Sequence, residues 1–261
     1  MLRISVYIIA FNEAEKIEQA LKSVLWADEV VVADSYSTDG TPAIAERLGA
    51  RVVQIPFQGF GELRNKAVAA CTHDWILSID ADERCTREVR DEILQILSGT
   101  PAHDAYLIPR RNYFMGKWIR YSGWYPNYRQ PQLFRKGKMS YTQDVVHEGY
   151  VIHSGQAPDI LKNDIWQYPF RNLEEVNRKM VRYSTLGAEK LKGKKATMSM
   201  ALTHAMWAFF KHFILQRGFL DGWPGFVIAF GHSEGAFYRY AKRVELDSGW
   251  QMPPSPPLTR S

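Results

Sequence analysis

The sequence predicts an α/β fold with a mostly parallel sheet, followed by a helical region of different character. Over the first third of the chain, short β-branched apolar runs alternate with segments whose apolar residues have helical spacing. Each run ends in a polar loop, and the last hundred residues become basic and rich in aromatic side chains. With 261 residues, of which 46% are hydrophobic, the chain can bury one sizeable core and carry a helical appendage.

The elements follow from these patterns in chain order. The predicted strands cover residues 4–9, 30–33, 51–55 and 75–79, and the predicted helices 14–25, 41–49 and 63–70. For the second helix, Thr41 is a suitable cap, Pro42 a suitable first residue and Gly49 a suitable end. Strands separated by helices imply right-handed crossovers, so the loops that follow the strands are expected to open at one edge of a mostly parallel sheet.

Two aspartates at the end of the fourth predicted strand, Asp80 and Asp82, carry the main functional signal. Hard cations such as Mg²⁺ and Mn²⁺ prefer carboxylate and phosphate oxygens, so a protein needs to supply only one or two ligands to a metal-bound diphosphate. An isolated Asp-x-Asp is also compatible with a solvated strand end that caps the next helix. The predicted topology brings further side chains to the same crevice, namely Phe11, Asn12, Glu13, Asp34 and Asp39. Because the chain has no Gly-x-Gly-x-x-Gly and no Walker lysine loop, we expect the metal to handle the phosphate.

Four segments in this order and spacing resemble a known family. They are 5–13 (SVYIIAFNE), 31–41 (VVADSYSTDGT), 64–67 (RNKA) and 79–83 (IDADE). They look like the family 2 inverting glycosyltransferases of GT-A fold, a Rossmann-like nucleotide-diphospho-sugar transferase fold, over about residues 1–160. The resemblance implies a nucleotide-sugar donor, usually a UDP-sugar. The residues that it implicates are Phe11, Glu13 and Asp34 for base and ribose, Arg64 near the nucleotide, and Asp80 and Asp82 for the ribose and the metal-bound diphosphate.

Inverting transfer also needs a carboxylate that takes the proton of the acceptor hydroxyl. Residues 140–149 (SYTQDVVHEG) offer Asp144, His147 and Glu148. A branch of family 2 that acts on lipopolysaccharide core has a Val-His-Glu motif here, so the resemblance points to Glu148 as the base. Asp144 stays open as an alternative, and His147 is expected to orient a carboxylate or phosphate. All three are also compatible with ordinary loop residues.

The resemblance to this branch extends over nearly the whole chain, through segments 123–126, 132–137, 182–185 and 217–222. It implies a β-glucosyltransferase that adds a hexose to the inner-core heptose of a lipid-A-linked acceptor. One departure is Gln167, which stands where relatives often carry a histidine and is a poor metal ligand. Trp124 and Tyr125 are candidates for stacking on an acceptor sugar, although many aromatic residues simply pack. The candidates for binding acceptor phosphates are Arg110, Arg111, Arg129 and Arg135.

The positive charge of the chain lies in its last third. Between Arg171 and Asp221 there are ten Lys or Arg and four Asp or Glu, whereas the whole chain has a net charge of +5. A basic run, 190–195 (KLKGKK), precedes the aromatic-rich stretch 196–210. This pattern favours helices that lie at a membrane surface, with packing on the catalytic domain or on another copy of the chain as the alternative. No nucleic-acid motif accompanies the charge, so nucleic acid is not an expected partner.

The sequence thus predicts a GT-A catalytic domain over 1–165, with a nucleotide-sugar half at 1–100 and an acceptor half at 101–165. A helical basic and apolar region at 166–250 and a disordered tail at 251–261 follow. Two cysteines give no disulfide framework, and the first ten residues are too short and strand-like for a signal peptide. We therefore expect a cytoplasmic enzyme that is peripheral to a bacterial inner membrane.

The expected activity is metal-dependent inverting transfer of a hexose, glucose from UDP-glucose in the first instance, to a lipid-A-linked heptose. Within the same class, the chain is also compatible with another sugar and with a polyprenyl-linked or protein acceptor. From another class, a non-catalytic module that binds nucleotide sugars or membranes would share the fold, but such a module has no need of a base.

Overall fold

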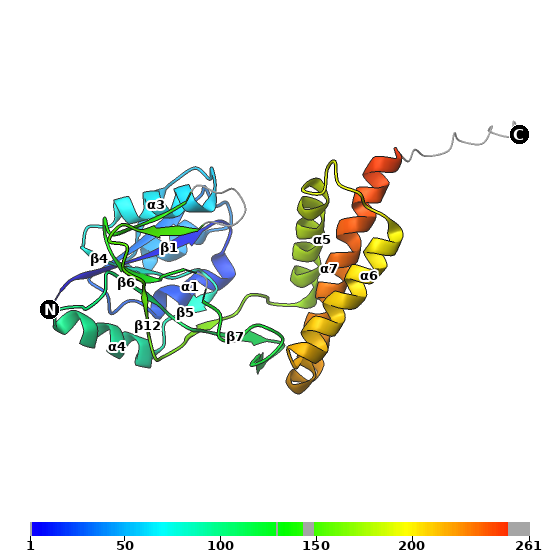
Figure 1. Cartoon of the computed structure of the whole chain (residues 1–261). Coiled ribbons are helices and arrows are strands. Elements are labelled where there is room, and N and C mark those ends of the chain that lie inside the picture. Colours follow the sequence, from blue (N-terminus) through cyan, green and yellow to red (C-terminus); the bar gives the residue numbers. More distant parts are fainter. Residues whose placement is uncertain (1, 129, 143–148, 250–261) are drawn as a thin grey trace, which may run out of the picture. The chain divides into compact units, whose positions relative to one another are not determined.

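The structure is a computed structural model that describes residues 2–128, 130–142 and 149–249. These residues divide into two compact units, and Figure 1 labels many of their elements. The first unit comprises the described residues of 1–120 and 124–169, and the second those of 121–123 and 170–261. The short segment 121–123 therefore belongs to the helical unit, although the sequence around it belongs to the first unit.

The first unit is built on a sheet whose described strands have the order β12-β6-β9-β4-β1-β2-β3. The parallel strands of one half are β1 (Ile4–Ala10), β2 (Glu29–Asp34), β3 (Arg51–Gln54) and β4 (Trp75–Ser78). In the other half, β9 (Leu133–Arg135) runs antiparallel to both β4 and β6 (Ala105–Leu107), and β12 (Asp159–Ile160) pairs parallel with β6. The predicted α/β fold with a mostly parallel sheet is confirmed.

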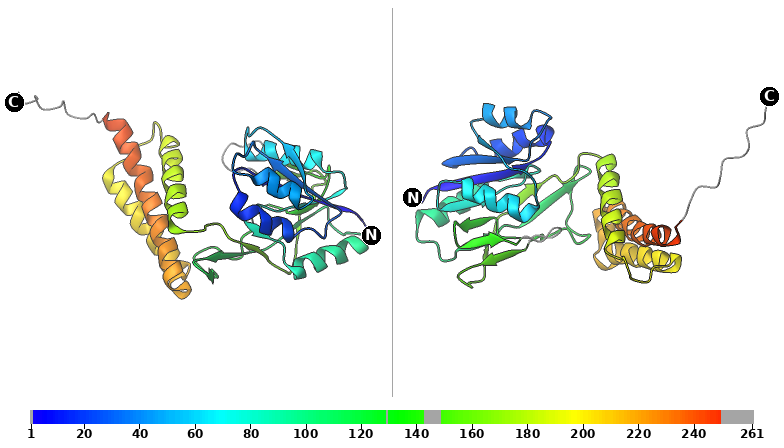
Figure 2. Two further views of the ribbon diagram at one scale, coloured as in Figure 1. Left: turned by 180° about the vertical axis from the view of Figure 1, so that it is seen from behind. Right: turned by 90° about the horizontal axis from the view of Figure 1, so that it is seen from above.

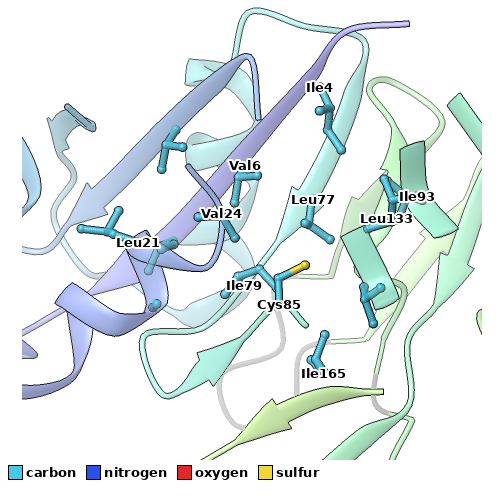
Figure 3. Close-up of a cluster of buried hydrophobic side chains, with 14 of the residues drawn as sticks. Ile4, Val6, Leu21, Val24, Leu77, Ile79, Cys85, Ile93, Leu133 and Ile165 are labelled. Carbon is cyan, nitrogen blue, oxygen red and sulfur yellow. The ribbon is translucent and has the colours of Figure 1, made fainter. Parts of the chain in front are cut away.

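Helices cover both faces of this sheet, which explains why its central strands read as unbroken apolar runs. The helices are α1 (Ala14–Lys22), α2 (Thr41–Arg47), α3 (Phe60–Ala70) and α4 (Arg87–Ser98). On one face, Val6 and Leu77 pack with Leu21 of α1 and Ile93 of α4 in the core cluster of Figure 3. The core of the opposite face contains Tyr7, Val31, Ile76 and Phe134 of the sheet together with Leu63 and Ala67 of α3.

Helix boundaries differ from the predicted ones at three places. The first helix ends at Lys22, and Val24 and Leu25 follow it in a turn. Thr41 is the first residue of α2 and not its cap, which is Gly40. The third helix begins at Phe60, because Gly59 adopts a φ of +144° that lets the chain turn sharply into it.

Two smaller sheets complete the first unit. The antiparallel pair β10 (Met139–Tyr141) and β11 (Tyr150–Ile152) flanks residues 143–148 in the sequence. A sheet of order β5-β13-β7-β8 joins β5 (Glu83–Arg84), β13 (Ile165–Gln167), β7 (Arg110–Phe114) and β8 (Lys117–Trp118). Because β5 follows Asp82 directly, this second sheet fixes the end of the segment that carries the two aspartates.

The second unit is helical. Its elements are α5 (Leu173–Glu189), α6 (Met198–Phe210), a π-helical turn (Lys211–Leu215), a 3₁₀ turn (Gly218–Asp221) and α7 (Trp223–Ser248). Helix α7 packs against both α5 and α6, as the two views of Figure 2 show. Gly225 allows α7 to begin against the 3₁₀ turn, because a Cβ there would overlap the carbonyl group of Gly218. Among the described residues, no helix combines the length and the apolar character that crossing a bilayer requires.

Candidate active site

The strand order brings the predicted polar residues together at one edge of the sheet. Strand β1 lies between β2 and β4, and all three are parallel, so the loops that follow them leave the same edge side by side. The chain moves outward from β1 to β2 and β3 and then crosses back to form β4 on the other side of β1. Such a reversal of strand order opens a crevice, and open α/β proteins bind their ligands there.

Hydrogen bonds join the loops after β1 and β2, which together form one wall of the candidate site. Asp34 is buried at the end of β2 and accepts hydrogen bonds from the backbone N–H and the hydroxyl of Ser37, at 2.9 and 2.5 Å. Ser37 Oγ in turn accepts from the N–H of Asn12 at 2.8 Å, and Asn12 Oδ1 accepts from the N–H of Thr38 at 2.8 Å. Beside this framework, Phe11 is 61% exposed, which leaves its ring available to a ligand.

Asp39, which the sequence placed in the same crevice, has a local structural function. Its carboxylate accepts from the N–H of Ala14 at 2.9 Å and from the N–H and hydroxyl of Thr41 at 3.1 and 2.5 Å. Thr41 Oγ1 also accepts from the N–H of Glu13 at 2.9 Å. These bonds hold the first turns of α1 and α2 together, so Asp39 orders the loops that carry Glu13.

Asp80 is held by a buried arginine of α3. Arg64 lies on α3 with 4% of its surface exposed, and its Nη2 donates to Asp80 Oδ1 at 2.8 Å while Nη1 donates to Ser78 Oγ at 3.1 Å. Burial alone would lower the pKa of the Arg64 guanidinium, but the charge of Asp80 holds that pKa well above its ordinary value. Arg64 is thus permanently charged and buried, and it acts on the site through Asp80.

Asp82 is a carboxylate crowded by negative charge. Burial, followed by the charges of Asp80 and Glu83, raises the pKa of Asp82 from 3.8 to about 7. Gln167 Nε2 donates to both of its carboxylate oxygens, at 3.4 and 3.3 Å. A divalent cation would relieve the repulsion, and carboxylate oxygens are the donors that Mg²⁺ and Mn²⁺ prefer, so Asp80 and Asp82 fit such a metal.

The protein supplies few metal ligands in the part of the chain that the structure describes. Within 2–128, 130–142 and 149–249, no three His, Cys, Asp or Glu side chains gather as a metal-binding group. A cation held by Asp80 and Asp82 would complete its coordination with diphosphate oxygens and water, as Mg²⁺ usually does.

Glu83 is a site residue to which the sequence assigned no function. It is fully buried, and its Oε1 accepts from Arg110 Nε at 2.5 Å. Its Oε2 accepts from Gln132 Nε2 and from the N–H of Asp80, both at 3.0 Å. Glu83 therefore fixes the backbone of the Asp80–Asp82 turn to β7 and to the segment before β9. The only sequence signal was its place directly after Asp82.

A second buried framework leads to the candidate bases. Tyr7 of β1 donates to the hydroxyl of Tyr141 at 2.8 Å, and Asn65 of α3 exchanges two hydrogen bonds of 2.9 Å with the backbone of Tyr141. The N–H of the next residue, Thr142, donates to the carbonyl oxygen of Gly149 at 2.9 Å. The N–H of Gly149 donates in return to Thr142 Oγ1 at 2.8 Å. The three candidates, Asp144, His147 and Glu148, lie between these two anchored ends and outside the described residues.

The acceptor candidates fall into different classes. Tyr125 is half-buried and donates to Asp164 Oδ1 at 3.2 Å, and Trp124 is half-buried with its ring 5.7 Å from that of Phe114. Arg129 lies outside the described residues. The expectation for Arg110 is wrong, because this side chain is 2% exposed and paired with Glu83. Arg111 pairs with Asp164 at 2.8 Å and lies over the ring of Trp118.

Acidic side chains thus follow two parallel strands, β2 and β4, at the switch point of an open α/β sheet, where proteins of this architecture bind their ligands. Residues 5–153 match the family described as "Glycosyl transferase family 2". The chain belongs to this family, so the resemblance is confirmed for the family itself, and the α/β unit has the GT-A fold.

Relatives of known sequence agree with this membership. An uncharacterised glycosyltransferase of Rickettsia felis is 34% identical over 94% of this chain and 90% of its own length. A lipopolysaccharide core biosynthesis glycosyltransferase, LpsC of Rhizobium meliloti, is 26% identical over 93% of this chain and 95% of its own. Among solved structures, glucosyl-3-phosphoglycerate synthase of Mycobacterium tuberculosis, in complex with Mn²⁺ and UDP-glucose, matches with a TM-score of 0.36 and 30% identity. That match covers 43% of this chain and 44% of the synthase.

Proposed function

We propose that this protein is a metal-dependent inverting hexosyltransferase that transfers glucose from UDP-glucose to the inner-core heptose of a lipid-A-linked acceptor. The observation that carries the proposal is that Asp34, Asp80 and Asp82 follow the parallel strands β2 and β4 at one edge of the sheet in a family 2 chain. The choice of acceptor is supported by the relative from Rhizobium meliloti, which is named for lipopolysaccharide core biosynthesis.

The donor nucleotide is assigned to the wall formed by the loops after β1 and β2. Phe11 offers an exposed ring to the base, and Glu13 offers a half-buried carboxylate to the base or ribose. Asp34, whose carboxylate is buried against Ser37, is proposed to complete this wall beneath the base and ribose. Asp80, held by Arg64, is near enough to Asp82 for its charge to raise the pKa of Asp82, and together they would hold Mg²⁺ or Mn²⁺. When bound, the cation supplies positive charge to the departing diphosphate.

Transfer is a single displacement at the anomeric carbon. The acceptor oxygen forms a bond to this carbon while the bond to the diphosphate oxygen breaks, and the hydroxyl proton passes to a protein carboxylate. Glu148 is the proposed base and Asp144 the alternative. Trp124, Tyr125 and Arg129 are proposed to contact the acceptor, and His147 to orient a carboxylate or phosphate.

Product analysis tests the proposal. The full chain is incubated with UDP-glucose, UDP-galactose or UDP-N-acetylglucosamine and a heptose-bearing lipid acceptor, with Mg²⁺, Mn²⁺ or EDTA. We expect transfer from UDP-glucose, loss of transfer in EDTA, and a β-linked product in the proton NMR spectrum, because displacement inverts the α-configured donor. An α-linked product would overturn the inverting mechanism, and full activity in EDTA would overturn the metal requirement. Transfer of another sugar alone would overturn the choice of donor.

A further inference from the structure

The helical unit ends in a cluster of six aromatic side chains, which we call the aromatic tip. The tip consists of Phe209, Phe213, Phe219, Trp223, Phe226 and Phe230. We propose that it binds the surface of an anionic lipid bilayer, with the rings in the headgroup region and the neighbouring cations on lipid phosphates. The inference does not depend on which sugar the protein transfers.

The tip is continuous, although its rings come from four successive elements. Phe209 of α6 lies 5.2 Å from Phe213 of the π-helical turn, measured between ring centroids. Phe213 lies 6.3 Å from Phe219 of the 3₁₀ turn and 5.8 Å from Phe226 of α7. Trp223 and Phe230 extend the cluster, at 5.4 and 6.2 Å from Phe226. The turns that connect α6 with α7 thus gather the rings into one patch.

The outer members of this patch face solvent. Trp223 is 74% exposed, Phe230 49% and Phe219 48%, and the aliphatic neighbour Leu215 is 56% exposed. The exposed apolar surface continues along α6 through Trp207, which is 56% exposed. Scattered apolar side chains are normal on a protein surface, but a contiguous patch of this kind marks a site of interaction.

The charges in the stretch of sequence that contains most of the tip are mainly positive. Between Lys190 and Ser233 the sequence contains one acidic residue, Asp221. That carboxylate is 2% exposed and accepts from the N–H of Tyr121 at 3.0 Å and from Ser122 Oγ at 3.1 Å. The basic residues of the same stretch are Lys190, Lys192, Lys194, Lys195, Lys211 and Arg217. The single acid of this stretch is therefore buried, whereas Lys211, between Phe209 and Phe213 in the sequence, and Arg217, two residues before Phe219, are exposed. The next acid, Glu234, is half-buried and follows Phe230 by four residues.

This combination favours a bilayer over a second copy of the chain. A symmetric contact between two tips would bring Lys211 and Arg217 of one copy toward those of the other, and like charges repel. An anionic membrane surface attracts the same cations, with about 1 kcal/mol for each Lys or Arg close to it. Trp and Phe rings on one side and cations beside them are the composition of segments that lie in a membrane interface.

Vesicle sedimentation tests the proposal with the full chain. The probes are vesicles of phosphatidylcholine alone and vesicles with phosphatidylglycerol at one third of the lipid. We expect binding to the anionic vesicles that weakens with salt. The double variant Phe219→Ser/Trp223→Ser should bind at least tenfold more weakly. The matched control Val181→Ser/Tyr183→Ser, which changes side chains of α5 that are 52% and 51% exposed, should bind as the unchanged chain does.

A variant without the two cations separates the contribution of charge from that of the aromatic rings. Lys211→Gln/Arg217→Gln should lower affinity for anionic vesicles by roughly tenfold or more and reduce its dependence on salt. Equal binding by the tip variant and the unchanged chain would overturn the proposal. The proposal would also be overturned if the unchanged chain failed to bind anionic vesicles and instead formed an oligomer in sedimentation velocity that the tip variant abolishes. Circular dichroism shows that each variant folds, and no donor or acceptor is needed, so these outcomes are separate from those of the transferase assay.

Discussion

The guanidinium of Arg64 donates a hydrogen bond to the carboxylate of Asp80 at 2.8 Å. The Arg64 side chain is almost entirely buried, whereas that of Asp80 is 26% exposed. The pair joins α3 to the end of β4, and the same guanidinium also donates to Ser78 Oγ at 3.1 Å. A carboxylate fixed in this way does not have to be ordered when a cation or a ribose arrives, so part of the entropy cost of binding is removed beforehand.

Replacement of Arg64 tests this relationship. Arg64→Met leaves Asp80 without its buried cation, and we expect the free energy of unfolding to fall by about 3 kcal/mol. Arg64→Lys should lose less, because lysine keeps the charge but not the two-pronged geometry. Urea denaturation followed by circular dichroism measures both. An unchanged midpoint in Arg64→Met would show that the pair contributes nothing to stability.

Asp82→Asn should remove metal-dependent donor binding. The neutral amide relieves the crowding around Asp80 and Glu83 but is a weaker metal ligand, so thermal stabilisation by UDP-glucose should no longer respond to Mn²⁺. The matched control is Asp74→Asn, an exposed acid just before β4 at the opposite edge of the sheet, which should behave as the unchanged chain does. Normal Mn²⁺-dependent stabilisation in Asp82→Asn would remove Asp82 from the metal site.

Glu83 is predicted to be a structural residue and not a ligand. In Glu83→Gln the buried Arg110 loses its counter-charge, so the free energy of unfolding should fall by roughly 3–5 kcal/mol. The double variant Glu83→Gln/Arg110→Met removes both charges and keeps an acceptor for the N–H of Asp80, so it should recover much of that loss. Chemical denaturation of the single and double variants measures the coupling. If the double variant were no more stable than Glu83→Gln alone, the structural role of the Glu83–Arg110 pair would be contradicted.

The base can be identified by separating binding from chemistry. Glu148→Gln should slow transfer by roughly 10²-fold or more and leave the affinity for UDP-glucose unchanged, because general base catalysis typically contributes that much. Single-turnover rates and donor titrations on Glu148→Gln and Asp144→Asn provide the comparison. If only Asp144→Asn shows the slow transfer with intact donor binding, the function of base moves to Asp144.

Glu29 should make stability depend on pH in the acid range. Burial raises its pKa, but hydrogen bonds from Arg51, Ser5 and Thr72 outweigh burial and lower the pKa from 4.5 to about 2. A lowered pKa in the folded state stabilises above pH 4.5, and this contribution disappears as the pH falls toward 2. The difference in unfolding free energy between the unchanged chain and Glu29→Gln should therefore shrink over that range, by roughly 1–2 kcal/mol because solvent screens a carboxylate near the surface. A difference that is constant between pH 7 and pH 2 would contradict this prediction.

The central half of the fold could be predicted from local patterns. Strands β1, β2 and β4 are apolar on both faces and end at polar residues, so their parallel order already implied that Asp34, Asp80 and Asp82 share an edge. The supporting contacts were not predictable in this way. Glu83 meets Arg110 across 27 positions and Tyr7 meets Tyr141 across 134, and only the folded sheet brings such distant residues together.

The helical unit shows the same limit. Its charge and aromatic content were visible in the sequence, but the gathering of Phe213, Phe219 and Phe226 depends on the π-helical and 3₁₀ turns between α6 and α7. Arg217 adopts a φ of +56° between these turns, a conformation that no periodicity marks. The assignments of Asp144, His147, Glu148 and Arg129 stay predictions, because these residues lie outside the described chain.

The helical unit consists of two segments that are separate in the sequence, 121–123 and the residues from 170 onward. Hydrogen bonds from Tyr121 and Ser122 to Asp221 hold the two segments together. A fragment that ends at residue 169 would therefore keep segment 121–123 but lose Asp221, which accepts its hydrogen bonds. The reverse fragment, starting at residue 170, would retain a buried carboxylate without its donors, which is costly. A chimaera that takes its helical unit from a relative would therefore have to exchange two segments together, 121–123 and the chain from residue 170 onward.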